Sequence, residues 1–174
     1  MDRFALIKPL FKYSNVAYYS VSLEEDEKTI YDEFVEKHTI VNKDKLYHIL
    51  KWLKEIGEKY GAQDRFFRNE AKFADTTALP PKGIKKEPTY VEFGKPKAND
   101  LRLYTFKLNP KVVFLFSGDI KTKQKAQDCQ NVKSHFLLAN HLTKAIENAL
   151  KEKEVFWIKN FTEIDCIDDF KLYY

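Results

Sequence analysis

The residues best suited to chemistry are cationic, and they gather in the segment 101–135. This segment contains seven lysine or arginine residues but only two aspartates. Three of the lysines, Lys121, Lys123 and Lys125, follow closely after Gly118. Such a concentration of positive charge is what a polyanion such as nucleic acid binds, although a solvated basic face without a partner would carry the same charges. The segment therefore predicts either a nucleic-acid contact or an ordinary basic surface.

Other residue types that support catalysis or metal binding are not arranged for it. His135 and His141 are six residues apart, which is not the i, i+4 spacing that places two metal ligands on one helix face. His38 and His48 have no recognisable serine or cysteine partner for a nucleophilic triad. The aspartates in 165–169 are interpreted as an exposed acidic tail, and the glycines are isolated rather than grouped in a phosphate-binding loop. We therefore expect no metal and no cofactor.

Length and composition predict one folded domain over residues 1–174. The chain has 44% hydrophobic and 15% aromatic residues, and its net charge is only +4. A chain of this size buries about 70% of its surface on folding, so a hydrophobic core can supply the stability. No apolar run approaches the length of a membrane-spanning helix, and the first residues make a poor signal peptide. We therefore expect a cytoplasmic protein without a membrane contact, in which Cys129 and Cys166 are reduced.

The first part of the chain is expected to form a strand followed by a helix. Residues 15–21 are aromatic and β-branched, which is typical of a strand. Ser22 and Glu25 have the spacing of a capping box, which predicts a helix that runs to about Lys37. This helix start also gives the acidic residues that follow Ser22 a structural explanation, because carboxylates are stabilised at the positive end of a helix dipole.

The next segments are expected to be helical and then irregular. Apolar residues in 44–60 recur at helical spacing, and Gly61 has the position of a C-terminal cap. A further helical stretch is expected in 62–73. The proline and glycine residues of 76–88 then predict the longest loop of the chain.

After this loop, the pattern changes to that of a β-sheet. Three segments rich in Val, Tyr, Phe and Leu are expected to be strands, namely 89–93, 101–108 and 111–116. Asn109 and Pro110 form a short turn, which makes the last two strands an antiparallel hairpin. A helix over 132–153 and a strand over 155–158 are expected to follow. The whole pattern predicts an α+β fold, in which helices pack on one side of a small, mainly antiparallel sheet.

Three motifs carry a resemblance to a known family. They are an arginine-bearing strand, a hydrophobic strand that ends in glycine and a turn of the form Lys-x-x-Gln-Lys; here they read Leu101-Arg102-Leu103-Tyr104-Thr105-Phe106, Val112 to Gly118 and Lys121-Thr122-Lys123-Gln124-Lys125. Over residues 88–150, the chain resembles the RelE/HigB superfamily of bacterial toxins, and more closely its phage-derived HigB-like branch. The resemblance implies a RelE-like sheet with N-terminal helices and a final helix packed on it. Residues 1–14 and 151–174 would be extensions of that domain.

The resemblance implies an endoribonuclease that cleaves mRNA, generally on the ribosome, without a metal. In that reaction the ribose 2′-hydroxyl attacks the neighbouring phosphate, so the protein must mainly stabilise negative charge. At the matching positions, Arg102 would clamp the phosphate because a guanidinium can bind two phosphate oxygens. The other catalytic cations implied are Lys121, Lys123 and Lys125. The residues expected to contact flanking RNA are Lys95, Lys97, Lys107 and, by base stacking, Tyr104.

The resemblance also implies a partner, because toxins of this superfamily are neutralised by a cognate antitoxin protein. Three alternatives remain open. The chain could bind RNA or the ribosome without cleaving, could act on a protein as the gyrase-directed ParE branch does, or could be an interaction protein of a defence or phage system. Cleavage of mRNA, binding of RNA and arrest of DNA replication are the observations that distinguish them.

Overall fold

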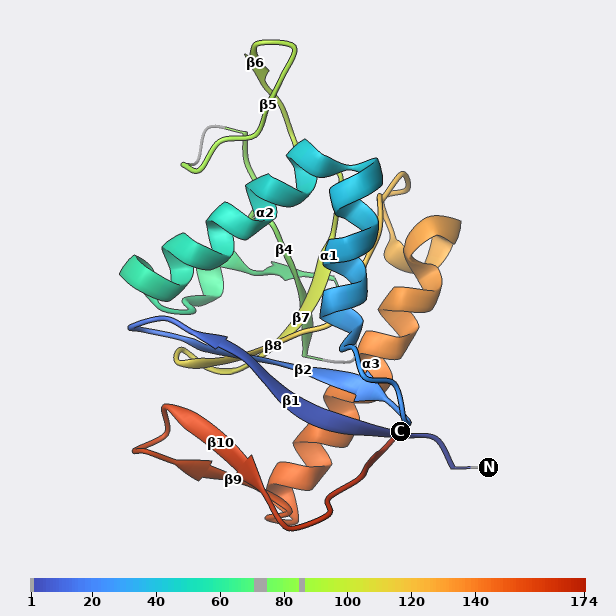
Figure 1. Cartoon of the computed structure of the whole chain (residues 1–174). Helices are drawn as coiled ribbons and strands as arrows, with labels where there is room; N and C mark the ends of the chain where they lie inside the picture. Colours follow the sequence, from blue (N-terminus) through green and yellow to red (C-terminus); the bar gives the residue numbers. More distant parts are fainter. Residues whose placement is uncertain (1, 71–74, 85–86) are drawn as a thin grey trace.

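The structure is a computed structural model that describes residues 2–70, 75–84 and 87–174. Its largest element is a seven-stranded sheet with the strand order β11-β1-β2-β8-β7-β4-β3 (Figure 1). In that order, the strands are β11 (Leu172–Tyr173), β1 (Phe4–Lys12), β2 (Ala17–Leu23), β8 (Val112–Leu115), β7 (Leu103–Asn109), β4 (Thr76–Leu79) and β3 (Arg68–Asn69). Two small hairpins lie outside this sheet, β5 (Val91–Glu92) with β6 (Lys95–Pro96) and β9 (Val155–Ile158) with β10 (Glu163–Cys166).

Most neighbouring strands of the large sheet are antiparallel, whereas β2 and β8 are parallel partners. Strands β7 and β8 form a hairpin in which Phe106 lies opposite Phe114. All four residues of β8 are buried, because this strand is central and covered on both faces. The predicted α+β class, the mainly antiparallel sheet and the β7–β8 hairpin are therefore confirmed.

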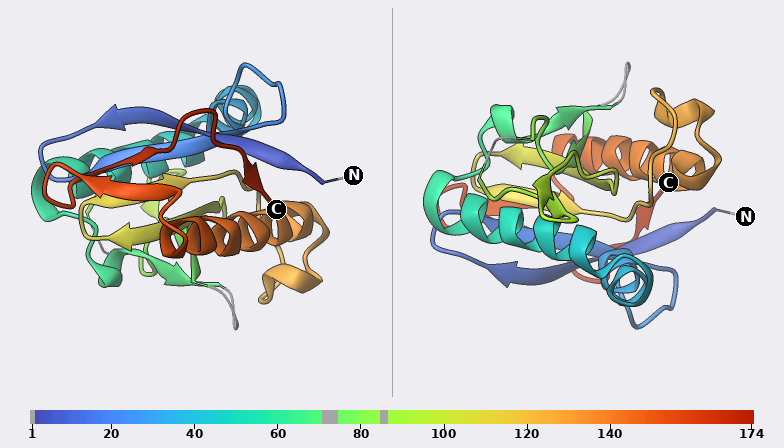
Figure 2. Two further views of the ribbon diagram at one scale, coloured as in Figure 1. Left: turned by 90° about the horizontal axis from the view of Figure 1, so that it is seen from below. Right: turned by 90° about the horizontal axis from the view of Figure 1, so that it is seen from above.

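Helices cover both faces of the large sheet (Figure 2). Helices α1 (Ile30–Val41) and α2 (Lys43–Glu55) pack on one face with Leu103 and Val113, whereas α3 (Gln130–Lys151) packs on the other with Tyr104 and Phe114. Residues of the two apolar clusters, one on each face of the sheet, alternate along the strands because successive side chains point to opposite faces. The prediction of helices on one side only was wrong, since a continuous apolar strand such as β8 needs apolar cover on both faces.

The first helix begins later than its predicted cap. Thr29 caps α1, because its hydroxyl accepts a hydrogen bond from the Asp32 N–H at 3.0 Å and its own N–H donates to the Asp32 carboxylate at 3.4 Å. Ser22 is instead a buried residue of β2 that pairs with Leu6 of β1. The prediction of a helix start at Ser22 was wrong, because pairing with β1 extends the strand through this position.

The range 44–60 is helical as predicted, although its end is a π-helical turn, η1 (Ile56–Tyr60), which stops at Gly61 with φ of 72°. The helix expected in 62–73 is absent from 62–70, which form a 3-10 turn, η2 (Asp64–Phe66), and β3; residues 71–74 lie outside the described residues. The loop expected in 76–88 begins instead with β4, which pairs with β7. Both predictions failed because pairing with a distant strand outweighs the local pattern.

The segments expected to be extensions take part in the large sheet. Residues 4–12 form β1, which hydrogen-bonds to β2, and β11 pairs with β1 near the end of the chain. Ala5 of β1 and Leu172 of β11 are buried in the core. The predicted strand 155–158 is confirmed as β9, and the predicted helix 132–153 is confirmed as α3. None of the helices in the described ranges is long and apolar enough to cross a membrane.

Candidate functional site

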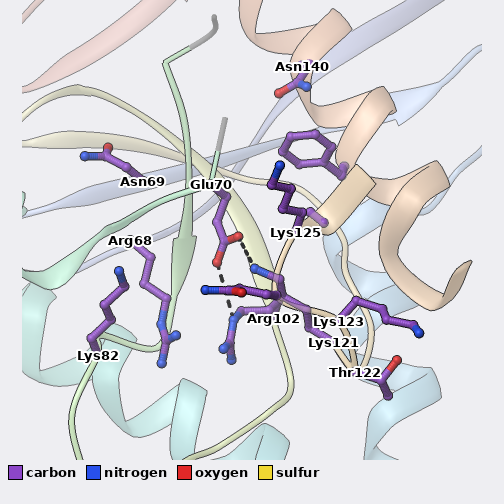
Figure 3. Close-up of a pocket in the computed structure, with 13 residues that line it drawn as sticks. Arg68, Asn69, Glu70, Lys82, Arg102, Lys121, Thr122, Lys123, Lys125 and Asn140 are labelled. Atoms are coloured by element: carbon purple, nitrogen blue, oxygen red, sulfur yellow. Dashed lines mark hydrogen bonds and ion pairs between the residues drawn. The ribbon is translucent and has the colours of Figure 1, made fainter. Parts of the chain in front are cut away.

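A cleft of about 800 Å³ opens between the β3 edge of the large sheet and the first half of α3 (Figure 3). Its lining comes from segments that lie far apart in the sequence: Arg68, Asn69, Glu70, Lys82, Arg102, Lys121, Thr122, Lys123, Gln124, Lys125, Ala126, Phe136 and Asn140. Among these described residues, six side chains are cationic and one, that of Glu70, is anionic. The cleft therefore carries a positive charge that favours an anionic ligand.

Backbone pairing at the start of β7 places Arg102 beside Lys121. The Arg102 N–H donates to the Asp119 carbonyl at 3.0 Å, and the Lys121 N–H donates to the Asp100 carbonyl at 2.8 Å. The two segments thus run antiparallel before the hairpin proper begins. This pairing brings the arginine expected to clamp phosphate next to the basic turn, which we define as residues 121–125.

Glu70 joins these two cations. Its side chain is only 6% exposed, and its two carboxylate oxygens lie 2.5 Å from Lys121 Nζ and 3.5 Å from Arg102 Nε (Figure 3). Solvent screens such interactions weakly when the groups are buried. The carboxylate therefore holds both cations in defined positions at the centre of the cleft, while the cations around it remain in excess.

Arg68 and Arg102 bring two guanidinium groups into the same cleft. Burial lowers the pKa of Arg102, and the nearby carboxylate of Glu70 opposes this effect. Burial and the charge of Arg102 lower the pKa of Arg68 to about 10. Both side chains are still charged at neutral pH, and Arg68 Nε donates to the Pro80 carbonyl at 2.6 Å. A bound anion would relieve the repulsion between the two guanidinium groups.

The basic turn contacts Cys129, a fully buried residue. Cys129 lies between the 3-10 turn η3 (Ala126–Asp128) and the start of α3. The Thr122 N–H and hydroxyl both lie 3.4 Å from Cys129 Sγ. Burial raises the pKa of this thiol, but hydrogen bonds from the basic turn and from the first turn of α3 outweigh burial and lower it to about 6. This contact fixes the backbone that carries the exposed residues Lys123 and Lys125.

Four residues predicted to contact RNA lie outside the lining of the cleft. The Tyr104 side chain is fully buried and packs edge-on against Phe136 with ring centroids 5.6 Å apart, so its expected role in base stacking was wrong. It lies on the same sheet face as Arg102, as strand alternation requires. The other three are accounted for elsewhere: Lys107 pairs with Asp64, Lys97 lies beside β6 and pairs with Glu92 at 3.4 Å, and Lys95 is an exposed residue of β6.

Sequence reasoning missed the cleft residues that surround β3 and β4. Arg68 and Glu70 lie in a range that was expected to be helical, and Lys82 lies in the expected loop. No local pattern marks them, because their position depends on the pairing of β4 with β7. The positions of Phe136 and Asn140 on a common side of α3 could have been predicted, since residues four apart on a helix share a face.

The chain matches no model of a protein family, no curated protein and no solved structure. The described ranges contain no group of three or more His, Cys, Asp or Glu side chains that could hold a metal ion.

Proposed function

We propose that this protein is an endoribonuclease that binds RNA in the cleft and cleaves it by attack of the ribose 2′-hydroxyl, as the resemblance to RelE/HigB toxins implies. The observation that carries the proposal is the buried carboxylate of Glu70, held between Arg102 and Lys121 in a cleft lined by six cationic side chains. This combination provides both charge stabilisation and a proton acceptor for phosphodiester cleavage.

The distribution of the cations favours a phosphate chain over a single small anion. Arg68 and Lys82 lie on one side of Glu70, and the lysines of the basic turn lie on the other (Figure 3). Successive phosphates of a single strand would meet successive cations along this line. A solitary phosphate would engage only the centre and would leave the outer lysines without a partner.

The proposed reaction requires that a scissile phosphate displaces Glu70 from Arg102. The 2′-oxygen then bonds to phosphorus, and its proton passes to the Glu70 carboxylate. The bond from phosphorus to the 5′-oxygen breaks, and the Lys121 ammonium gives a proton to that oxygen. Arg102 stabilises the additional negative charge of the transition state through two parallel hydrogen bonds. The products are a 2′,3′-cyclic phosphate and a 5′-hydroxyl.

We further propose that an antitoxin protein controls this activity, on the strength of the resemblance. A segment with acidic side chains could occupy the cleft in competition with RNA, because both would neutralise the same cations. The direct search for this partner is to co-express the chain with the products of neighbouring genes and to find one that restores growth.

The proposal is tested by inducible expression in bacteria of the wild type and of the Arg102→Ala, Lys121→Ala double variant. We expect growth arrest and new mRNA ends with the wild type and neither with the double variant. Lys54→Ala is the control, because Lys54 is an exposed lysine of α2 that does not line the cleft. Arrest with intact RNA and blocked DNA replication would favour a ParE-like action instead. Unimpaired growth at good yield would favour a binding protein.

A further inference from the structure

A buried chain of hydrogen bonds connects α2 to the Arg102 guanidinium. His48 Nε2 lies 2.9 Å from the Pro88 carbonyl, and His48 Nδ1 lies 2.9 Å from Asn99 Nδ2. The Arg102 side chain in turn donates from Nη1 to the backbone carbonyl of Asn99 at 2.7 Å. Asn99 is 3% exposed, whereas His48 and Arg102 are each 9% exposed. This series of hydrogen bonds therefore runs through the interior of the protein and ends in the cleft.

The hydrogen bonds fix the protonation state of His48. A carbonyl can only accept, so Nε2 must carry the proton that points to Pro88. Asn99 Nδ2 is a donor, so Nδ1 must be the acceptor and the ring must be neutral. The second Nδ2 proton goes to the Lys45 carbonyl at 2.9 Å, and Asn99 Oδ1 accepts from the Leu101 N–H at 3.0 Å. Every polar group of the Asn99 side chain is thus used.

A proton on His48 Nδ1 would set two donors against each other. Asn99 would have to turn away, which would leave the Leu101 N–H without its acceptor and shift the Asn99 carbonyl that holds Arg102. The net effect of the surroundings favours the neutral ring. Burial lowers the pKa of His48, the hydrogen bond to the Pro88 carbonyl raises it, and Lys51 on the same helix lowers it further.

The facing segment 88–100 brings few net charges to His48. Tyr90 lies with its ring centroid 5.7 Å from that of His48 and donates to Glu92. Asp100 is paired with Lys45 of α2 at 2.7 Å, and Asp44 is the remaining carboxylate of this region. The carboxylates of the region are therefore directed mainly to Lys45 and Tyr90, and none is hydrogen-bonded to the His48 ring among the described residues.

We propose that Asn99 is a positioning residue that holds the Arg102 guanidinium in the cleft only while His48 is uncharged. The proposal rests on the proposed function in so far as Arg102 binds the scissile phosphate. It adds a pH-sensitive control of that site, which is exerted from the opposite face of the sheet. The contact of Arg102 with Asn99 exists whether or not the chain cleaves RNA, so the two proposals can fail separately.

The test uses a single-stranded oligonucleotide with 2′-deoxyribose throughout, which binds but offers no 2′-hydroxyl. Its affinity is measured for the full chain between about pH 8 and pH 5, across the range in which histidine titrates. We expect binding to weaken on acidification, whereas simple accumulation of positive charge would strengthen it. His48→Gln keeps a donor and an acceptor but cannot charge, and should abolish the weakening of binding on acidification. His141→Gln, at an exposed position of α3, should follow the wild type.

Asn99→Asp provides the reciprocal variant. A carboxylate at position 99 cannot donate to neutral His48 but can pair with the charged ring. Near neutral pH, oligonucleotide binding should therefore be roughly tenfold weaker than in the wild type, which is the effect of losing one hydrogen bond to the charged Arg102 guanidinium. Binding should recover on acidification, when His48 becomes charged. Asn148→Asp adds the same charge at an exposed position of α3 and serves as the control. Wild-type pH dependence in His48→Gln, or wild-type binding in Asn99→Asp at every pH, would overturn the proposal.

The position of Arg102 is also followed without any ligand, by the pH dependence of its guanidinium nitrogen signals in nuclear magnetic resonance. These signals should change with the titration of His48 in the wild type and stay constant in His48→Gln. This result would stand even if the wild type cleaves no RNA, which would refute only the proposed function. If the Arg102 signals do not change as His48 titrates, the positioning role is refuted. This conclusion holds even if the chain is an active nuclease, and even if Asn99→Asp fails to fold.

Discussion

Gly118 packs directly against the backbone carbonyl of Arg102, and no side chain can be placed between them. A Cβ atom at this position would overlap the Arg102 carbonyl group, which is itself part of the strand that leads into β7. The glycine that ends the hydrophobic strand in the sequence therefore serves the close approach of two backbones. This approach allows the Arg102 N–H to reach the Asp119 carbonyl and sets Arg102 beside the basic turn.

Gly118→Ala should therefore damage both stability and anion binding. The methyl group would push the Arg102 backbone away, and overpacking of this kind costs about 1–3 kcal/mol. Denaturant unfolding and oligonucleotide affinity measure the two effects. Gly94→Ala is the contrast, because no atom of the described residues lies within 4 Å of its Cβ position and only the positive φ of 75° would strain an alanine. It should lose stability without losing affinity, and equal affinity in both variants would contradict the role given to Gly118.

The lysines of the basic turn should set the salt dependence of RNA binding. Each neutralised phosphate of a single strand contributes about −0.7 to the slope of log affinity against log salt. If Lys123 and Lys125 each neutralise one phosphate, the slope of the double alanine variant should be shallower by about 1.4. Titration of a single-stranded RNA at several salt concentrations measures this difference. An unchanged slope would place the RNA elsewhere on the surface.

Glu70→Gln should separate binding from cleavage. Loss of the carboxylate removes a negative charge that competes with RNA phosphates for Arg102 and Lys121, so RNA affinity should rise. Loss of the proton acceptor should lower the cleavage rate at least about 100-fold, the usual minimum for a general base. Single-turnover kinetics and binding titrations report the two effects separately. A cleavage rate close to that of the wild type would remove Glu70 from the reaction.

The stability of the fold should fall as the pH drops below about 6.5, where unperturbed histidine becomes charged. Burial lowers the pKa of His38, His48 and His135, so the unfolded chain binds more protons than the folded chain in this range. Their contribution is complete above the unfolded pKa and is lost as the pH falls through the lower folded values. Denaturant midpoints between about pH 7.5 and pH 5 check this expectation. Cys129, with a pKa of about 6, also titrates in this interval, so the measurement is repeated in Cys129→Ser.

Glu147 acts in the opposite direction and needs its own control. Burial and the nearby Asp75 raise its pKa to about 7, so its protonated form favours the folded state as the pH falls. The Glu147→Gln variant removes this effect and should show the histidine-dependent loss of stability more clearly. A rise in stability on acidification in this variant would contradict the assignment to the histidines.

The central strand and the last helix could be predicted from the sequence because each has a long, unambiguous apolar pattern. Strand β1 could not, since its residues include lysines and Pro9, which lies at a bulge in the pairing with β2. The two capping patterns at Ser22 and Thr29 are alike in sequence, and only the pairing of β2 with β1 decides between them.

The cleft could be predicted only from one side. Arg102 and the basic turn are marked by local charge and by the hairpin that follows, whereas Glu70 gains its position from β3 and β4, whose pairing joins segments distant in sequence. Dependence on distant segments also explains why the burial of Tyr104 was not predicted. Its place in a strand was predicted, but its burial depends on α3, which covers that face of the sheet and provides Phe136.

The most direct test of the proposed reaction compares a defined RNA with its copy that has one 2′-deoxyribose at the cleaved position, each incubated with the purified chain. Free RNA is assayed with a chelator present, and RNA on translating ribosomes, which need Mg²⁺ to stay assembled, is assayed without one. The proposed reaction predicts cleavage of the RNA but not of its 2′-deoxy copy, with a 2′,3′-cyclic phosphate and a 5′-hydroxyl at the new ends, and loss of this cleavage in Arg102→Ala. Cleavage of the 2′-deoxy copy at the same position, or no cleavage of either RNA in either setting, would contradict it.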